Sequence, residues 1–98
     1  MSEVFKALSH PTRRTILRLL REHAMSAGEL ADHFDLSKPT LTGHFNTLRD
    51  AALVDVRRHG TSLIYHLNAS VLEEALLESL EMFHLSGVRR NLTKEAKA

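Results

Sequence analysis

Apolar residues recur at helical spacing through the first half of this 98-residue sequence. A short helix is expected from Glu3 to Ser9, and His10-Pro11 interrupts it because the residue before a proline resists the helical conformation. Pro11 suits the first turn of a second helix that runs to about His23. The apolar residues of these two helices are Val4, Phe5, Leu8, Ile16, Leu17, Leu19 and Leu20.

Two serines mark the starts of two further helices. Ser26 with Glu29 forms a capping box, which opens a third helix, and Ser37 caps a fourth helix that begins at Lys38. At 100° per residue, one narrow stripe of the fourth helix is apolar and predicts its buried side. This stripe contains Leu41, Phe45, Leu48 and Ala52.

After the fourth helix the apolar period changes from helical to alternating. Residues 53–57 and 61–67 are expected to form strands, joined at residues 58–60 as a hairpin. Residues 69–84 return to helical spacing. The fold class is therefore mainly α with a small β-hairpin (α+β), in the order α-α-α-α-β-β-α that is typical of a winged helix-turn-helix.

Length and composition indicate one soluble domain at residues 1–85, followed by a basic, frayed tail at 86–98. A chain this short buries only roughly 60–65 % of its unfolded surface, so a stabilising second copy is expected. No apolar run approaches the ~18 residues of a membrane span, and the first residues lack the order of a signal peptide. The absence of cysteine excludes disulfides and thiolate metal sites. We expect a cytoplasmic protein without membrane insertion.

Charge is distributed unevenly although the net charge is only +1. Residues 36–68 carry +2, residues 69–84 carry −4, and residues 85–98 carry +3. A basic middle segment beside an acidic helix favours a polyanionic partner for the middle segment.

The outer face of the fourth helix is small and polar. Small side chains let a helix enter the major groove of DNA, about 12 Å wide, and donate or accept hydrogen bonds there. Cations at the start of this helix and at the hairpin tip lie where the DNA backbone would pass. The candidates are Lys38, Thr40, Thr42, Gly43 and Asn46 on the helix, with Arg57, Arg58 and His59 on the hairpin.

Two stretches of the sequence resemble the ArsR/SmtB family of winged-helix repressors. VFKALSHPTRRTILRLL is similar to that family's opening signature, and SAGELADHFDLSKPTLTGHFNTLRDAALVDVRRHGTSLIYHLN to its helix-turn-helix and wing. The resemblance covers roughly residues 3–84 and is greatest to the cysteine-free autorepressor (SdpR-like) subgroup. It implies a bacterial homodimeric repressor, not an enzyme, whose partner is double-stranded DNA. The family's base-contacting positions fall on Lys38, Thr40, Thr42 and Gly43, with Ser37 at the start of that helix, and its wing on Arg57 to Thr61.

The first and last helices are the expected dimer interface, as the resemblance also implies. The last helix carries more apolar surface than one small core covers, and such surface marks interfaces. The interface candidates are Val4, Phe5, Leu8, Leu72, Leu76, Leu77, Leu80 and Phe83.

The sequence departs from the metal-sensing members of that family. The stretch that matches their paired cysteines, Glu29 to Phe34, contains none, and the last helix offers only Glu81 and His84. Zinc takes three or four ligands, so we expect no metal and no cofactor. The family's usual glycine after the fourth helix is Ala52, which would cost roughly 1 kcal/mol in a left-handed conformation.

Several questions stay open at the level of sequence. His44 lies beside the apolar stripe, where packing with a hydrogen bond is favoured over direct base contact. Arg13 and Arg14 either reach phosphate or pair with carboxylates. Two alternative functions are a metal- or small-molecule-responsive repressor with its effector site at the dimer interface, and a protein-interaction module on a winged-helix scaffold.

Overall fold

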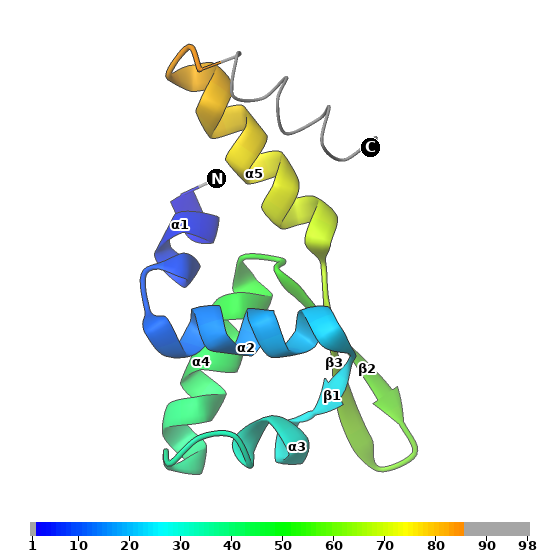
Figure 1. The fold of residues 1–98 in the computed structure, drawn as a ribbon. Helices are drawn as coiled ribbons and strands as arrows, with labels where there is room; N and C mark the ends of the chain where they lie inside the picture. Colours follow the sequence, from blue (N-terminus) through cyan, green and yellow to red (C-terminus); the bar gives the residue numbers. More distant parts are fainter. Residues whose placement is uncertain (1, 86–98) are drawn as a thin grey trace.

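The computed structural model describes residues 2–85, which form a helical domain with a small antiparallel sheet (Figure 1). The expected basic tail at 86–98 lies outside the described residues. The elements are α1 (Ser2–Leu8), α2 (Pro11–Glu22), β1 (Met25–Ser26), α3 (Ala27–Ala31), α4 (Lys38–Asp50), β2 (Val54–His59), β3 (Ser62–Leu67) and α5 (Ala69–Met82). The predicted winged helix-turn-helix is confirmed, with one additional strand, β1, between α2 and α3.

The capping box predicted at the start of α3 is present with both of its hydrogen bonds. The Glu29 N–H donates to Ser26 Oγ and the Ser26 N–H donates to Glu29 Oε1, each over 3.1 Å. Hydrogen bonding to Ser26, first its backbone and then its hydroxyl, lowers the pKa of Glu29. A carboxylate at this position also suits the positive end of the helix dipole, so the turn into α3 is fixed locally.

The sheet contains one strand more than the sequence predicts. β1 pairs with β3 through Met25–Tyr65 and Ser26–Ile64, which gives the antiparallel order β1-β3-β2. A two-residue strand shows no alternating period, and it exists because an edge of β3 is available to pair with it. The strand connects the sheet directly to α3, because Ser26 is both a residue of β1 and the N-cap of α3.

The hairpin turn lies later in the chain than predicted. His59 pairs with Ser62, so the loop is Gly60-Thr61 and not residues 58–60. Gly60 has φ +64°, and glycine at the first central position is typical of the type II′ turns that suit twisted hairpins. Arg57, Arg58 and His59 consequently lie within β2, while Thr61 lies in the turn.

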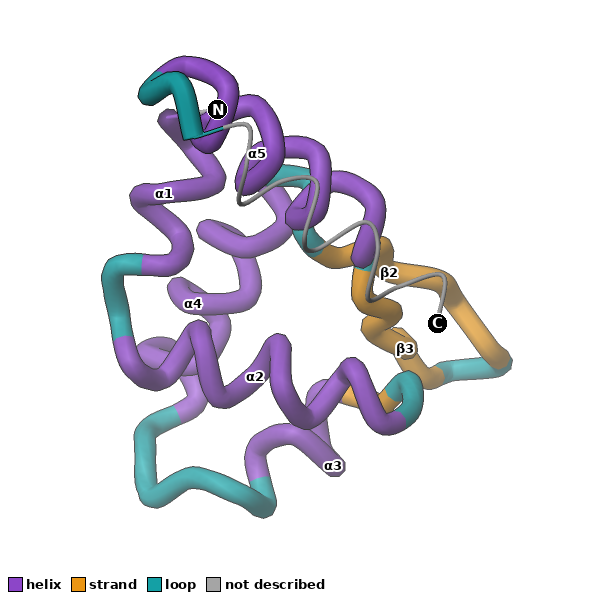
Figure 2. Tube along the Cα trace, turned by 45° about the horizontal axis from the view of Figure 1, so that its top comes forward, coloured by secondary structure: helices purple, strands orange, loops and turns teal. Residues whose placement is uncertain are grey.

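Every helix and strand contributes to one hydrophobic core. α2 crosses the domain from α1 at one end to the sheet at the other (Figure 2). α4 packs against α1, α2 and β2. The buried apolar residues are Val4, Ala7, Ile16, Leu17, Leu20, Met25, Leu30, Leu41, Phe45, Leu48, Ala51, Leu53, Val54, Tyr65 and Ala75.

The C-terminus of α4 ends in a Schellman motif built on a strained alanine. The Leu53 N–H donates to the Leu48 carbonyl over 3.0 Å, and the Ala52 N–H to the Arg49 carbonyl over 2.9 Å. Leu48 and Leu53 are fully buried, as the motif's hydrophobic contact requires. Ala52 has φ +59°, so it adopts the left-handed conformation whose cost was considered from the sequence. Its predicted place in the buried stripe is wrong, because α4 ends at Asp50 and Ala52 is exposed.

The strain at Ala52 predicts a stabilising substitution. Ala52→Gly should raise the free energy of unfolding by about 1 kcal/mol, because glycine adopts positive φ without the steric cost of a Cβ. Urea unfolding followed by circular dichroism measures the change. Ala69→Gly, at an exposed position in right-handed helix, is the matched control and should lower stability. Equal effects of both substitutions would contradict the strain at Ala52.

Candidate nucleic-acid interface

The fourth helix, α4, separates its buried and exposed residues by face. Leu41, Phe45 and Leu48 are buried on the inner side. Each candidate DNA-binding residue on α4 or at its cap is exposed. These residues are Ser37, Lys38, Thr40, Thr42, Gly43 and Asn46. The arrangement gives a rigid helix with an outer surface of small hydrogen-bonding groups.

The start of α4 is held by hydroxyl groups that are partly used within the chain. Ser37 Oγ accepts from the Thr40 N–H over 3.3 Å and donates to Thr40 Oγ1 over 2.9 Å. Ser37 therefore acts as the predicted helix cap, and its proton is already committed. The Thr40 hydroxyl accepts this bond and keeps its own proton for another acceptor, such as a phosphate or base oxygen.

The middle of the outer face brings a further residue into the surface. Asn46 Oδ1 accepts from Arg49 Nη2 over 3.3 Å. Arg49 is exposed one turn along from Asn46, and sequence reasoning did not single it out, although i, i+3 spacing would have shown it. A Cβ built at Gly43 meets nothing within 4 Å. The fold therefore does not require glycine at position 43. The absence of a side chain there leaves the outer surface of α4 flat at this point.

The hairpin presents its cations beyond the core. Arg58 is exposed and makes no hydrogen bond or ion pair within residues 2–85, whereas Arg57 Nη2 lies 3.8 Å from Asp55 Oδ2. The exposed pair contributes little to stability and leaves Arg57 able to bind another anion. His59 and Thr61 are also exposed. The hairpin is tied to α4 by the rings of Phe45 and Tyr65, whose centroids lie 4.9 Å apart.

Neither arginine at the start of α2 pairs with a carboxylate among residues 2–85; both bind backbone carbonyls instead. Arg14 Nη1 donates to the Leu8 carbonyl over 2.8 Å, and Arg13 Nε donates to the Ala7 carbonyl over 2.7 Å. Both side chains thus bind the unpaired carbonyls at the C-terminus of α1, where cations are favourable. Arg13 reaches further and contacts α4 at His44.

His44 is a buried, hydrogen-bonded residue of the inner side of α4. It is 9 % exposed, and its Nδ1 lies 3.0 Å from Arg13 Nη1. A guanidinium only donates, so Nδ1 accepts and the ring is neutral with its proton on Nε2. Burial, the neighbouring His10 ring and the Arg13 charge lower the pKa of His44. The packed interpretation of His44 is confirmed, and base contact is not available to a ring in this position.

The last helix ends before His84. α5 stops at Met82, and His84 has φ +59° in a second Schellman motif, in which the Leu85 N–H donates to the Leu80 carbonyl. Among residues 2–85, no three His, Asp or Glu side chains come together as a metal site. Nor does any helix in that range have the length and apolar character needed to cross a membrane.

Comparison with known proteins agrees with this geometry. Residues 8–57 match a family described as "Helix-turn-helix domain". The chain is 45 % identical over 76 residues to the transcriptional repressor SdpR of Bacillus subtilis, covering 78 % of this chain and 84 % of that protein. It is 40 % identical over 73 residues to an arsenical resistance operon repressor of Staphylococcus xylosus, covering 74 % of this chain and 70 % of that protein. The chain belongs to the ArsR family of winged helix-turn-helix transcriptional repressors.

Solved structures of the ArsR family show the same fold. An ArsR-like transcriptional regulator from Rhodococcus sp. RHA1 superposes with a TM-score of 0.75 at 29 % identity, over 99 % of this chain and 91 % of that one. This ArsR-family protein is therefore a DNA-binding transcriptional repressor, and the expectation that it is not an enzyme agrees with its relatives. The residue-level DNA and dimer assignments remain predictions.

The neutral state of His44 predicts a pH dependence of stability. Its folded-state pKa lies below the ordinary value of about 6.5, so the unfolded chain binds more protons once the pH falls below that value. The stabilisation is therefore complete above pH ~6.5 and is lost as the pH falls toward the folded-state pKa. Urea unfolding from about pH 7.5 to about pH 5.5 should show a smaller loss of stability in His44→Asn, which keeps an acceptor and does not titrate. Parallel losses in both proteins would contradict this role.

Proposed function

We propose that this protein is a homodimeric repressor that binds an inverted-repeat operator, with its own promoter among its targets. The observation that carries the proposal is the outer face of α4, which is exposed and polar on a helix whose inner face is buried. The likeness to SdpR, a transcriptional repressor, supports the assignment to repression. Two such helices in a symmetric dimer would enter successive major grooves about 34–36 Å apart.

Base recognition is assigned to the middle of α4. Thr42 and Asn46 lie one turn apart on its exposed side, and Asn46 can bind adenine N6 and N7 through its amide. Its carbonyl oxygen must then exchange the bond from Arg49 for a bond from the base, while Arg49 turns to a phosphate. Lys38 and Thr40, at the start of the helix, complete this surface.

Backbone recognition is assigned to the wing. Arg58 has no partner within residues 2–85, so its charge is available to a phosphate or to the minor groove. Arg57 exchanges a long, exposed contact with Asp55 at little cost. These cations contribute affinity that is common to all DNA sequences and decreases with salt.

Dimerisation is assigned to an apolar surface shared by α1 and α5. A groove lined by Ser2, Phe5, Ser79, Met82 and Phe83 lies between these helices. Phe5, Leu76 and Phe83 are 40 %, 45 % and 69 % exposed, which leaves large apolar area for a partner. The Cα radius of gyration of 15.0 Å exceeds the ~13 Å of a compact chain of this length, since α5 projects from the body (Figure 1).

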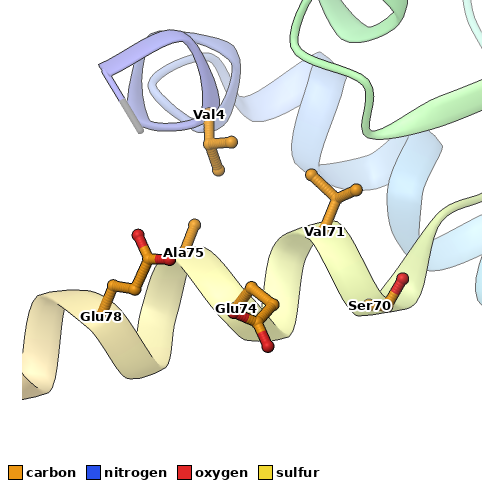
Figure 3. Close-up of a pocket in the computed structure, with 6 residues that line it drawn as sticks. All are labelled: Val4, Ser70, Val71, Glu74, Ala75 and Glu78. Atoms are coloured by element: carbon orange, nitrogen blue, oxygen red, sulfur yellow. The ribbon is translucent and has the colours of Figure 1, made fainter.

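Part of the predicted interface set lies inside the chain. Val4 is 5 % exposed, points from α1 toward α5 (Figure 3), and lines a pocket together with Val71 and Ala75. It contributes to the core of its own chain and offers little surface to a partner. Leu8 and Leu72 also pack against the core, and Leu77 and Leu80 are half-buried. The interface we propose therefore centres on Phe5, Leu76 and Phe83.

Binding to the DNA upstream of the protein's own gene tests the function. The wild-type protein should bind that DNA more tightly than random competitor, with and without a chelator. Thr42→Ala or Asn46→Ala should cost about 1–3 kcal/mol on the operator and little on random DNA. Arg58→Ala should weaken both and reduce the salt dependence by about one phosphate contact. Equal weakening of operator and random DNA by Thr42→Ala, with Arg58→Ala harmless, would overturn the assignment.

A matched pair of leucine substitutions tests the dimer. Leu76→Asp should convert a dimer into a folded monomer, because a carboxylate would be buried without a partner in the interface. Leu63→Asp is the control, since Leu63 is 44 % exposed on the wing and should leave the dimer intact. Analytical ultracentrifugation at micromolar concentration distinguishes the two states. A monomeric wild-type protein, or a dimeric Leu76→Asp variant, would contradict the interface.

A further inference from the structure

Arg13 is bonded to two different helices at once. Its Nε donates to the Ala7 carbonyl over 2.7 Å and its Nη2 to the Lys6 carbonyl over 3.0 Å, both at the end of α1. Its third nitrogen, Nη1, lies 3.0 Å from His44 Nδ1 on α4. Because Arg13 itself belongs to α2, one planar guanidinium joins α1, α2 and α4.

The histidines beside Arg13 are held as hydrogen-bond acceptors. His10 Nδ1 accepts from the Thr12 N–H over 3.1 Å, and His44 Nδ1 accepts from Arg13. The two rings lie 4.4 Å apart between centroids. A proton on His44 Nδ1 would set one donor against another, and it would add a positive charge next to the Arg13 guanidinium. The bond between Arg13 and His44 therefore requires a neutral His44 ring.

We propose that Arg13 is a positioning residue for DNA binding, which holds α4 in register with α1 through neutral His44 and releases it when His44 is protonated. This inference rests on the proposed operator binding and dimer. It assigns Arg13 and His44 a role in the affinity for DNA, in addition to their role in the stability of a single chain.

The position of the cluster explains why affinity should depend on it. α1 lies in the proposed dimer surface and α4 in the proposed DNA surface, so their relative placement sets the distance between the two recognition helices of a dimer. That distance must match one turn of DNA for both helices to bind at once. Arg13 is the residue in the described range whose side chain binds both elements.

The charges around His44 act in one direction. The titratable and charged groups that affect it are His10, which precedes α2, and Arg13 on α2, and both are cationic when protonated. Together with burial, they lower the pKa of His44. Acid therefore converts an accepting ring into a repelled cation, which breaks the bond to Arg13.

Neighbouring arginines provide a matched pair for the test. Arg13→Gln and Arg14→Gln remove the same charge and the same kind of bond to the end of α1, but Arg13 also contacts α4. Ultracentrifugation first shows that each variant is dimeric. Fluorescence anisotropy then measures its binding to the DNA upstream of the protein's own gene. Arg13→Gln should lose about tenfold in operator affinity and Arg14→Gln less than about twofold. Arg13→Lys, which keeps the charge and loses the fork, serves if Arg13→Gln fails to fold.

His44→Asn supplies a readout that a purely structural role would not change. Asparagine places an accepting oxygen near the position of Nδ1 and does not titrate, so its affinity at about pH 7.5 should stay close to wild type. Between about pH 7.5 and about pH 5.5, wild type should lose affinity relative to His44→Asn. Parallel pH profiles, or equal effects of Arg13→Gln and Arg14→Gln, would overturn the positioning role. A wild-type protein without specific DNA binding would instead overturn the proposed function.

Discussion

Burial of the inner side of α4 is the constraint on which the rest of this structure depends. A helix that enters DNA must keep one side free, so every contact that fixes it has to come from the other side. Leu41, Phe45 and Leu48 supply that side, and burying three such side chains contributes on the order of 5–9 kcal/mol before entropy is counted. This is a large share of the stability of a small domain. Apart from Ser37, which caps the helix, the exposed candidate residues of α4 are not part of the hydrophobic core.

Contacts at three places on α4 decide where its outer side points. Phe45 packs against Tyr65 and so couples the helix to the wing. The Schellman motif at Ala52 turns the chain directly from α4 into β2, at the cost of a strained alanine. His44 couples the helix to α1 and α2 through Arg13. These contacts hold the hairpin, α4 and α1 in fixed relative positions, which a binding surface built from two elements requires.

The last helix, α5, is only partly covered by the rest of its own chain. Ala75 is the one residue of α5 that a single chain buries within the described range, and Leu76, Met82 and Phe83 extend beyond the core. The opposite composition of the two surfaces is informative: α4 presents small polar groups, whereas α1 and α5 present large apolar ones. One suits a hydrated polyanion and the other suits dry burial against a second chain. The glutamates of α5 make this helix acidic, and we predict that they face away from the DNA.

Short-range chemistry in the sequence determined the elements and their starts, because caps, proline and periodicity act within one or two turns. Ser26, Ser37 and Pro11 each begin a helix as predicted, and the exposed set on α4 follows from the 100° period. The tertiary structure decided what distant segments do to one another. Strand β1 exists only because β3 offers an edge, and Arg13 finds its partner 31 residues away at His44. Val4, which the sequence placed among the interface candidates, is buried in the core for the same reason. Periodicity shows which side of a helix is apolar, but only the tertiary structure shows which element covers that side.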